Sequence, residues 1–136
     1  MARDETQQWK TRPTLGELCD RLTILSLRRV KSVDADRVAL HRAISDVVDD
    51  AANYLGTEQA RILQEVCFLS ALNAQIWHLK DEMTDLSPES DEYSSRLITA
   101  HQLNGYRNQA KNSLSGAAGA AAASQLSNTM TDGLEI

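Results

Sequence analysis

The segment 57–86 carries apolar side chains with the period of an α-helix, and this feature constrains the fold more than any other. Leu72, Leu79 and Leu86 form one row along it. A neighbouring row advances by alternating steps of four and three residues and consists of Ile62, Val66, Leu69, Asn73, Ile76, Lys80 and Met83. So wide a stripe is typical of a helix that packs against two or three neighbours rather than one.

Capping signals predict two helices before this segment. Thr14 and Glu17 have the spacing of a capping box, so a helix is expected to begin at Leu15. Asp34 is the expected N-cap of a second helix. Gly56 marks the end of that helix, because glycine readily adopts the left-handed backbone conformation that follows many helices.

Two further helices complete the expected fold. The helix of segment 57–86 is expected to begin at Thr57 or Glu58, and a fourth helix is expected to have Ser87 as its N-cap, Pro88 as its first residue and Gly116 at its end. Short connections favour antiparallel neighbours. The sequence therefore predicts an all-α protein, an antiparallel four-helix bundle with up-down topology. The alternative is a pair of long hairpins that dimerises into a larger bundle.

The bundle is expected to occupy residues 14–114, between an N-terminal arm, 1–13, and an Ala/Gly/Ser-rich tail, 115–136. Six Gly and two Pro supply too few turns for an all-β fold. The tail has little to bury, so it does not offset the entropy cost of ordering on its own. The side chains expected to be almost fully buried are Leu22, Leu25, Ile44, Val48, Leu69 and Ile76.

Charge and cysteine content bear on partners and compartment. The net charge is −5, which argues against nucleic acid as a partner. Residues 1–31 hold seven Lys/Arg and four Asp/Glu, giving +3, and the remainder holds seven and fifteen, giving −8. Cys19 and Cys67 stand far apart in helical patterns, as free thiols do in a reducing compartment. We expect a cytoplasmic protein, or a virion-associated one if a phage encodes it, with no membrane span.

Two pairs of carboxylates have the spacing of a metal site. Glu17 and Asp20 lie three residues apart in the first expected helix, and Glu82 and Asp85 repeat this spacing in the third. Facing each other across a bundle, these oxygens would hold Mg²⁺, as catalytic or metal-binding groups of an enzyme acting on a nucleotide or another phosphorylated small molecule. The simpler interpretation is that all four face solvent, with Glu17 engaged in its cap. It requires no cofactor.

Several polar and aromatic residues are candidates for an interface. Asn73 and Asn104 occupy otherwise apolar rows, where a buried amide typically specifies register and oligomeric state. Trp77 is a candidate core or interface anchor, and Trp9 precedes every expected helix, so it is a candidate for docking on another chain. Late in the fourth expected helix, a polar run containing Arg107 and Lys111 is interpreted as a solvated face, with contact to phosphate or carboxylate groups as the alternative.

Two motifs resemble those of a known family. Residues 16–25 read Gly-Glu-Leu-Cys-Asp-Arg-Leu-Thr-Ile-Leu, and residues 73–77 read Asn-Ala-Gln-Ile-Trp. They resemble the G-E-L-x-D-[KR]-x-T-I-L and N-x-x-[IL]-W motifs of an uncharacterised bacterial family of small helical proteins, a domain of unknown function sometimes found near glycan-assembly genes. The resemblance covers about residues 14–114. It implies a helical fold in which the first and third helices pair, and it implies no activity.

Together these features predict a small helical interaction or structural protein, a homo-oligomer or a subunit of a larger assembly, of host, phage or prophage origin. The alternative is the metal-dependent enzyme described above. Under the first interpretation, replacing Trp9 or removing residues 115–136 is expected to weaken association.

Overall fold

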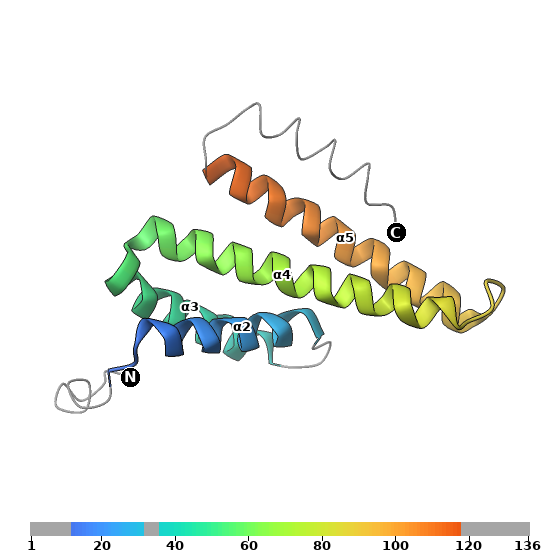
Figure 1. Ribbon diagram of the computed structural model, residues 1–136, viewed down its shortest axis with the longest axis horizontal. Coiled ribbons are helices and arrows are strands. Elements are labelled where there is room, and N and C mark those ends of the chain that lie inside the picture. Colours follow the sequence, from blue (N-terminus) through green and yellow to red (C-terminus); the bar gives the residue numbers. More distant parts are fainter. Residues whose placement is uncertain (1–11, 32–35, 118–136) are drawn as a thin grey trace.

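The computed structural model describes residues 12–31 and 36–117, and almost all of them are helical (Figure 1). The helices are α2 (Leu15–Lys31), α3 (Arg37–Leu55), α4 (Thr57–Thr84) and α5 (Asp91–Ala117). The predicted all-α fold with four helices is therefore confirmed. No helix in the described ranges is both long and apolar enough to cross a membrane.

The start of α2 follows the capping signal in the sequence. The Thr14 hydroxyl accepts a hydrogen bond from the Glu17 backbone N–H at 3.2 Å and donates one to the Glu17 carboxylate at 3.3 Å. Thr14 thus satisfies one of the backbone donors that have no partner inside the helix. The prediction that this helix begins at Leu15 is confirmed.

The start of α3 differs from the prediction. Its N-cap is Asp36, whose carboxylate accepts from the Ala39 backbone N–H at 3.1 Å. Asp34, the predicted N-cap, lies outside the described residues. Two aspartates stand two residues apart here, and either side chain suits an N-cap, so composition alone did not distinguish them.

Gly56 is the single residue between α3 and α4. Its φ is 86°, a conformation that side chains with a Cβ rarely adopt, and its N–H donates to the carbonyl of Ala52 at 2.8 Å. The chain therefore ends one helix and begins the next at Thr57 without a longer loop. The predicted end of the second helix and start of the third are both confirmed.

The start of α5 lies three residues beyond the predicted one. The Ser90 backbone N–H donates to the Ser87 carbonyl at 2.9 Å and closes a turn that contains Pro88. The fixed φ of proline suits this position of a turn as well as it suits the first residue of a helix. The Ser90 hydroxyl accepts from the Tyr93 N–H at 3.1 Å and so caps the helix. The prediction of Ser87 as the N-cap is wrong. Ser90 has the same hydroxyl group and directly precedes the acidic first turn of α5.

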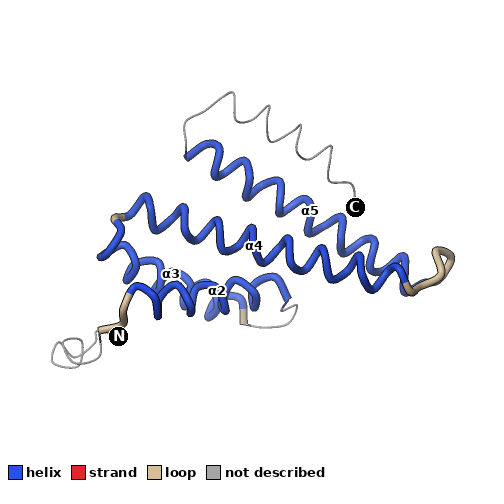
Figure 2. Tube along the Cα trace, viewed as in Figure 1, coloured by secondary structure: helices blue, strands red, loops and turns tan. Residues whose placement is uncertain are grey.

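Contacts across the helices show how they run. The Tyr54 hydroxyl, at the end of α3, donates to the carbonyl of Pro13, just before α2, at 2.7 Å, so these two helices are antiparallel. Glu82 pairs with Arg96, and Asn73 pairs with Arg107 further from the turn, so α4 and α5 form an antiparallel hairpin. Within the described ranges, α2, α3 and α4 pack against one another, whereas α5 packs against α4 alone (Figure 2).

The core consists of two apolar clusters that share α4. The first cluster lies between α2, α3 and the N-terminal half of α4, and it contains Leu18, Leu22, Ile44, Val47, Val48, Ala51, Ala60 and Cys67. The second lies mainly between α4 and α5, and it contains Leu72, Ile76, Leu79, Ala100 and Leu103. Phe68 packs on the second cluster, and the Arg29 guanidinium lies 3.8 Å from the centroid of its ring.

Four of the six predicted core residues, Leu22, Ile44, Val48 and Ile76, are buried. Leu25 and Leu69 are only half-buried, so the prediction of almost complete burial is wrong for these two. Leu25 packs at the edge of the first cluster, because α3 and α4 are the only described helices that contact α2. Leu69 belongs to neither cluster and lies beside the side of α4 that no other described helix covers.

The two-cluster core predicts different costs for two leucines on α4. Leu72→Ala should lower the free energy of unfolding by about 2–5 kcal/mol, because Leu72 is among the most deeply buried side chains and its truncation leaves a cavity. Leu69→Ala should lower it by less than half as much. Chemical denaturation of both variants measures the difference, and equal losses would contradict the assignment of the uncovered side of α4.

Candidate functional site

The four carboxylates predicted as a metal site lie in two separate places. Glu17 and Asp20 belong to the first turns of α2, whereas Glu82 lies in the last turn of α4 and Asp85 directly follows it. These two helix ends lie at opposite ends of the structure (Figure 1). Among the described residues, no three His, Cys, Asp or Glu side chains are grouped so as to hold a metal ion. The structure does not bring the predicted site together.

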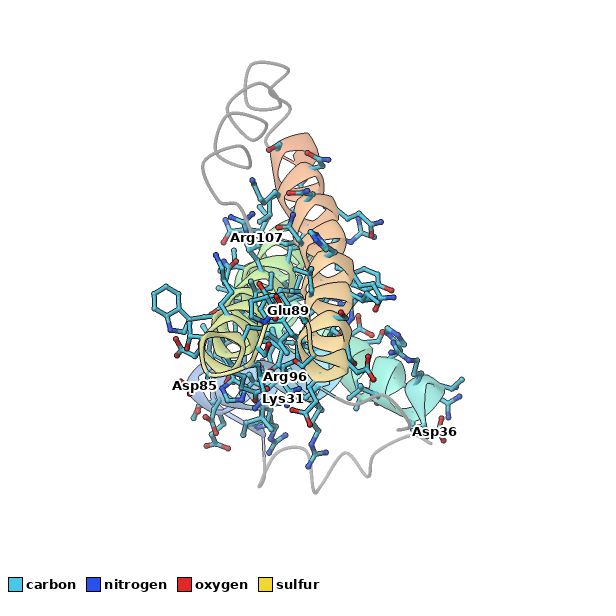
Figure 3. The ribbon with its side chains drawn as sticks, turned by 90° about the vertical axis from the view of Figure 1, so that its right-hand side faces the viewer. Lys31, Asp36, Asp85, Glu89, Arg96 and Arg107 are labelled. Atoms are coloured by element: carbon cyan, nitrogen blue, oxygen red, sulfur yellow. The ribbon has the colours of Figure 1, made fainter. Side chains whose placement is uncertain are left out.

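Glu82 instead joins α4 to α5 near the hairpin turn (Figure 3 labels its partner Arg96). One carboxylate oxygen lies 2.5 Å from Arg96 Nε, and the other lies 2.7 Å from His78 Nε2. The hydrogen bond from Arg96 is the main reason that the pKa of Glu82 lies below its ordinary value, and desolvation opposes it. The same bond raises the pKa of Arg96. The side chains of Arg96 and Glu82 are 34% and 36% exposed, so their ion pair contributes little to the free energy of unfolding. Its main effect is to hold the two side chains in place.

Asn73 and Asn104 do not form the predicted pair of buried amides. The Asn73 side chain is exposed, and its Oδ1 accepts a hydrogen bond from Arg107 Nε at 2.7 Å. The prediction that Asn73 is buried is wrong, because α5 covers only one edge of the row of α4 side chains to which Asn73 belongs. Asn104 is half-buried, and its Oδ1 is enclosed, with no hydrogen-bond partner within residues 12–31 and 36–117.

Arg107 and Lys111 are buried, with only 7% and 9% of their surfaces exposed. The interpretation of this run as a solvated face is therefore wrong for these two residues. They continue the row of α5 that contains Ala100, at spacings of three and four, so both lie on the side of α5 that faces α4 (Figure 3 labels Arg107). Arg107 Nη1 is enclosed and has no hydrogen-bond partner among the residues that the structure describes. Burial, followed by the positive charge of Arg107, lowers the pKa of Lys111.

One face of α4 presents large apolar side chains to solvent. Ile62, Val66 and Trp77 are 40%, 48% and 71% exposed. Their spacings of four and eleven residues place them on one side of the helix, with Asn73 between them. We call Ile62, Val66, Asn73 and Trp77 the α4 stripe. Trp9, the other predicted anchor, lies outside the described residues.

Comparison of the chain with protein-family models, with curated proteins and with solved structures finds no match in any of the three. The resemblance of residues 16–25 and 73–77 to the family of small helical proteins therefore stays a prediction.

The contacts of Glu82 predict a measurable titration. In NMR, its carboxyl should titrate below the ordinary value of 4.5, and Arg96→Gln should raise that midpoint. Because the folded pKa lies below the unfolded one, the ionised carboxylate stabilises the fold above pH 4.5, and this contribution is lost as the pH falls through the lowered pKa. Glu82→Gln should remove this part of the acid sensitivity.

The matched control is Arg61→Gln, which alters an exposed arginine near the other end of α4 and should leave the Glu82 titration unchanged. A Glu82 midpoint at or above 4.5 in the unaltered protein would contradict the assigned contacts.

Proposed function

We propose that the protein acts through protein–protein contact, as a homo-oligomer or as a subunit of a larger assembly. The observation that carries this proposal is the exposure of the α4 stripe, whose three apolar members lie along one side of the longest helix. Several large apolar side chains exposed along one side of a helix are typical of a surface that contacts another protein.

The composition of the α4 stripe supports the same proposal. Tryptophan is enriched among the residues that contribute most to binding at protein interfaces, and Trp77 is the most exposed large apolar side chain described. Asn73 supplies a polar group between Val66 and Trp77, where an amide can specify the register of a partner. A partner helix lying along α4 would cover the side that α5 leaves open.

The alternative function, a metal-dependent enzyme acting on a phosphorylated small molecule, has no comparable support. Its four carboxylates lie at opposite ends of the structure, and two of them, those of Glu17 and Glu82, already accept hydrogen bonds within the chain. The cytoplasm, or the virion of a phage, stays the proposed location of the assembly.

Light scattering or sedimentation tests the proposal directly. At about 100 μM the protein should show a mass of at least twice 15.0 kDa, because association is governed by concentration. The triple variant Ile62→Ser, Val66→Ser, Trp77→Ser should show the mass of a single chain and retain its helical circular dichroism, since all three side chains are exposed.

The matched control is Val38→Ser, which removes an even more exposed aliphatic side chain from α3, away from the α4 stripe, and should leave the mass unchanged. A single-chain mass for the unaltered protein, with no partner recovered, would contradict the proposal.

A further inference from the structure

The outer face of α2 combines positive charge with exposed apolar side chains. Its members follow one another at spacings of three, three, one and three residues, which place them on one side of the helix: Arg21, Ile24, Leu27, Arg28 and Lys31. All five side chains are exposed, and Ile24 and Leu27 are 46% and 40% exposed. We call these five residues the α2 patch.

The α2 patch is separate from the α4 stripe. The buried residues of α2, which are Leu18, Leu22 and Ser26, lie on the other side of that helix. Among the described helices, α2 contacts α3 and α4 but not α5, and it lies at the lower edge of the structure in Figure 1. The α2 patch is therefore a second surface that the described helices leave uncovered.

Positive charge dominates this part of the chain, although the net charge of the protein is −5. No Asp or Glu occurs from Arg21 to Lys31, and both carboxylates of α2, those of Glu17 and Asp20, precede the patch. None of the three patch cations forms an ion pair with another residue that the structure describes. Their charge is therefore available to an anionic partner.

Helix stability explains only part of this arrangement. Cations in the last turn of a helix offset the negative end of its dipole, and Arg28 and Lys31 have that place in α2. Arg21 lies well before the last turn, where this effect has decayed. The dipole also gives no reason for Ile24 and Leu27 to lie among the cations. A partner that offers both negative charge and apolar groups accounts for all five residues.

The composition of the α2 patch narrows the class of partner. Cations and large aliphatic side chains on the exposed side of a helix are typical of helices that lie at a membrane surface. There the cations attract anionic lipid headgroups, and the aliphatic side chains enter the boundary with the acyl chains. A nucleic acid presents negative phosphates without an apolar layer, so it would leave Ile24 and Leu27 in water. The patch is therefore complementary to an anionic bilayer in charge and in polarity.

We propose that the α2 patch binds the surface of a membrane that contains anionic lipids. The three cations pair with the headgroups, and Ile24 and Leu27 insert between them. The same headgroups repel Glu17 and Asp20, so the C-terminal half of α2 makes the contact. A contact made by so few side chains is weak, reversible and sensitive to salt. This proposal does not depend on association through the α4 stripe.

Co-sedimentation of the full chain with lipid vesicles tests the proposal. One kind of vesicle contains phosphatidylcholine alone, and the other contains equal parts of phosphatidylcholine and phosphatidylserine. In about 0.1 M salt, binding to the anionic vesicles should be at least about tenfold tighter than binding to the neutral ones. In about 0.5 M salt most of this difference should disappear, because salt screens the attraction.

Two double variants test which side chains are responsible. Arg28→Gln with Lys31→Gln should weaken binding to anionic vesicles at least about tenfold, because two cations are lost near the headgroups. Ile24→Ser with Leu27→Ser keeps every charge and should weaken binding at least about threefold, because no aliphatic side chain enters the bilayer. Circular dichroism establishes that each variant is folded. If the second variant does not fold, Ile24→Ser alone replaces it.

The matched control is Arg61→Gln with Lys80→Gln, which removes the same charge from exposed positions of α4 and should leave vesicle binding unchanged. Three results would overturn the proposal: equal binding to both kinds of vesicle, undiminished binding of the Arg28 and Lys31 variant, or an equal loss in the control. Binding to polyuridine or polyglutamate without binding to vesicles would also overturn it, and would assign a nucleic acid or an acidic protein as the partner.

Discussion

The whole structure depends on α4, because both apolar clusters are built on it. Its N-terminal half supplies Ala60 and Cys67 to the cluster with α2 and α3, and its C-terminal half supplies Leu72, Ile76 and Leu79 to the cluster with α5. An α-helix rises 1.5 Å per residue, so its 28 residues extend over about 40 Å, further than α2 or α3 can follow. The two clusters are therefore displaced along one helix, and each covers a different part of its surface.

This displacement explains the two unusual features of the protein together. The N-terminal half of α4 has α2 and α3 on one side, and α5 covers only part of the other side, so Ile62 and Val66 stay exposed. Among the described helices, α5 has one neighbour, α4, and the second cluster ends on α5 at Leu103. Beyond Leu103, the buried residues of α5 are Arg107, Ala110 and Lys111. An exposed apolar stripe and a buried basic pair follow from the same geometry.

Local signals in the sequence were sufficient for most helix boundaries. The capping box of Thr14 and Glu17 identified the start of α2, and Gly56 identified the end of α3. Both signals were sufficient because a cap depends only on residues within one helical turn. Where two equivalent residues competed, as at Ser87 and Ser90, the signal was ambiguous and the prediction was three residues early.

Burial and the candidate site could be predicted only in part, because they depend on which helices meet. The helical spacing placed Arg107 and Lys111 on the same row as Ala100, and that row faces α4. The charge of the two side chains argued for exposure to solvent. The prediction of a solvated face followed the charge rather than the spacing. Helical spacing also brought each pair of carboxylates onto one side of its own helix. It carried no information on whether the start of α2 and the end of α4 meet, and they do not.

The central claim, that the uncovered side of α4 is a contact surface, is tested most directly at Trp77. In a Trp9→Phe variant, Trp77 is the only tryptophan in the chain, so its fluorescence reports on the α4 stripe alone. Collisional quenching by iodide, measured across a hundredfold range of protein concentration, should be strong in dilute solution, where Trp77 is exposed, and should weaken as the concentration rises and a second chain covers it. Strong quenching that stays constant across the whole range would contradict the account.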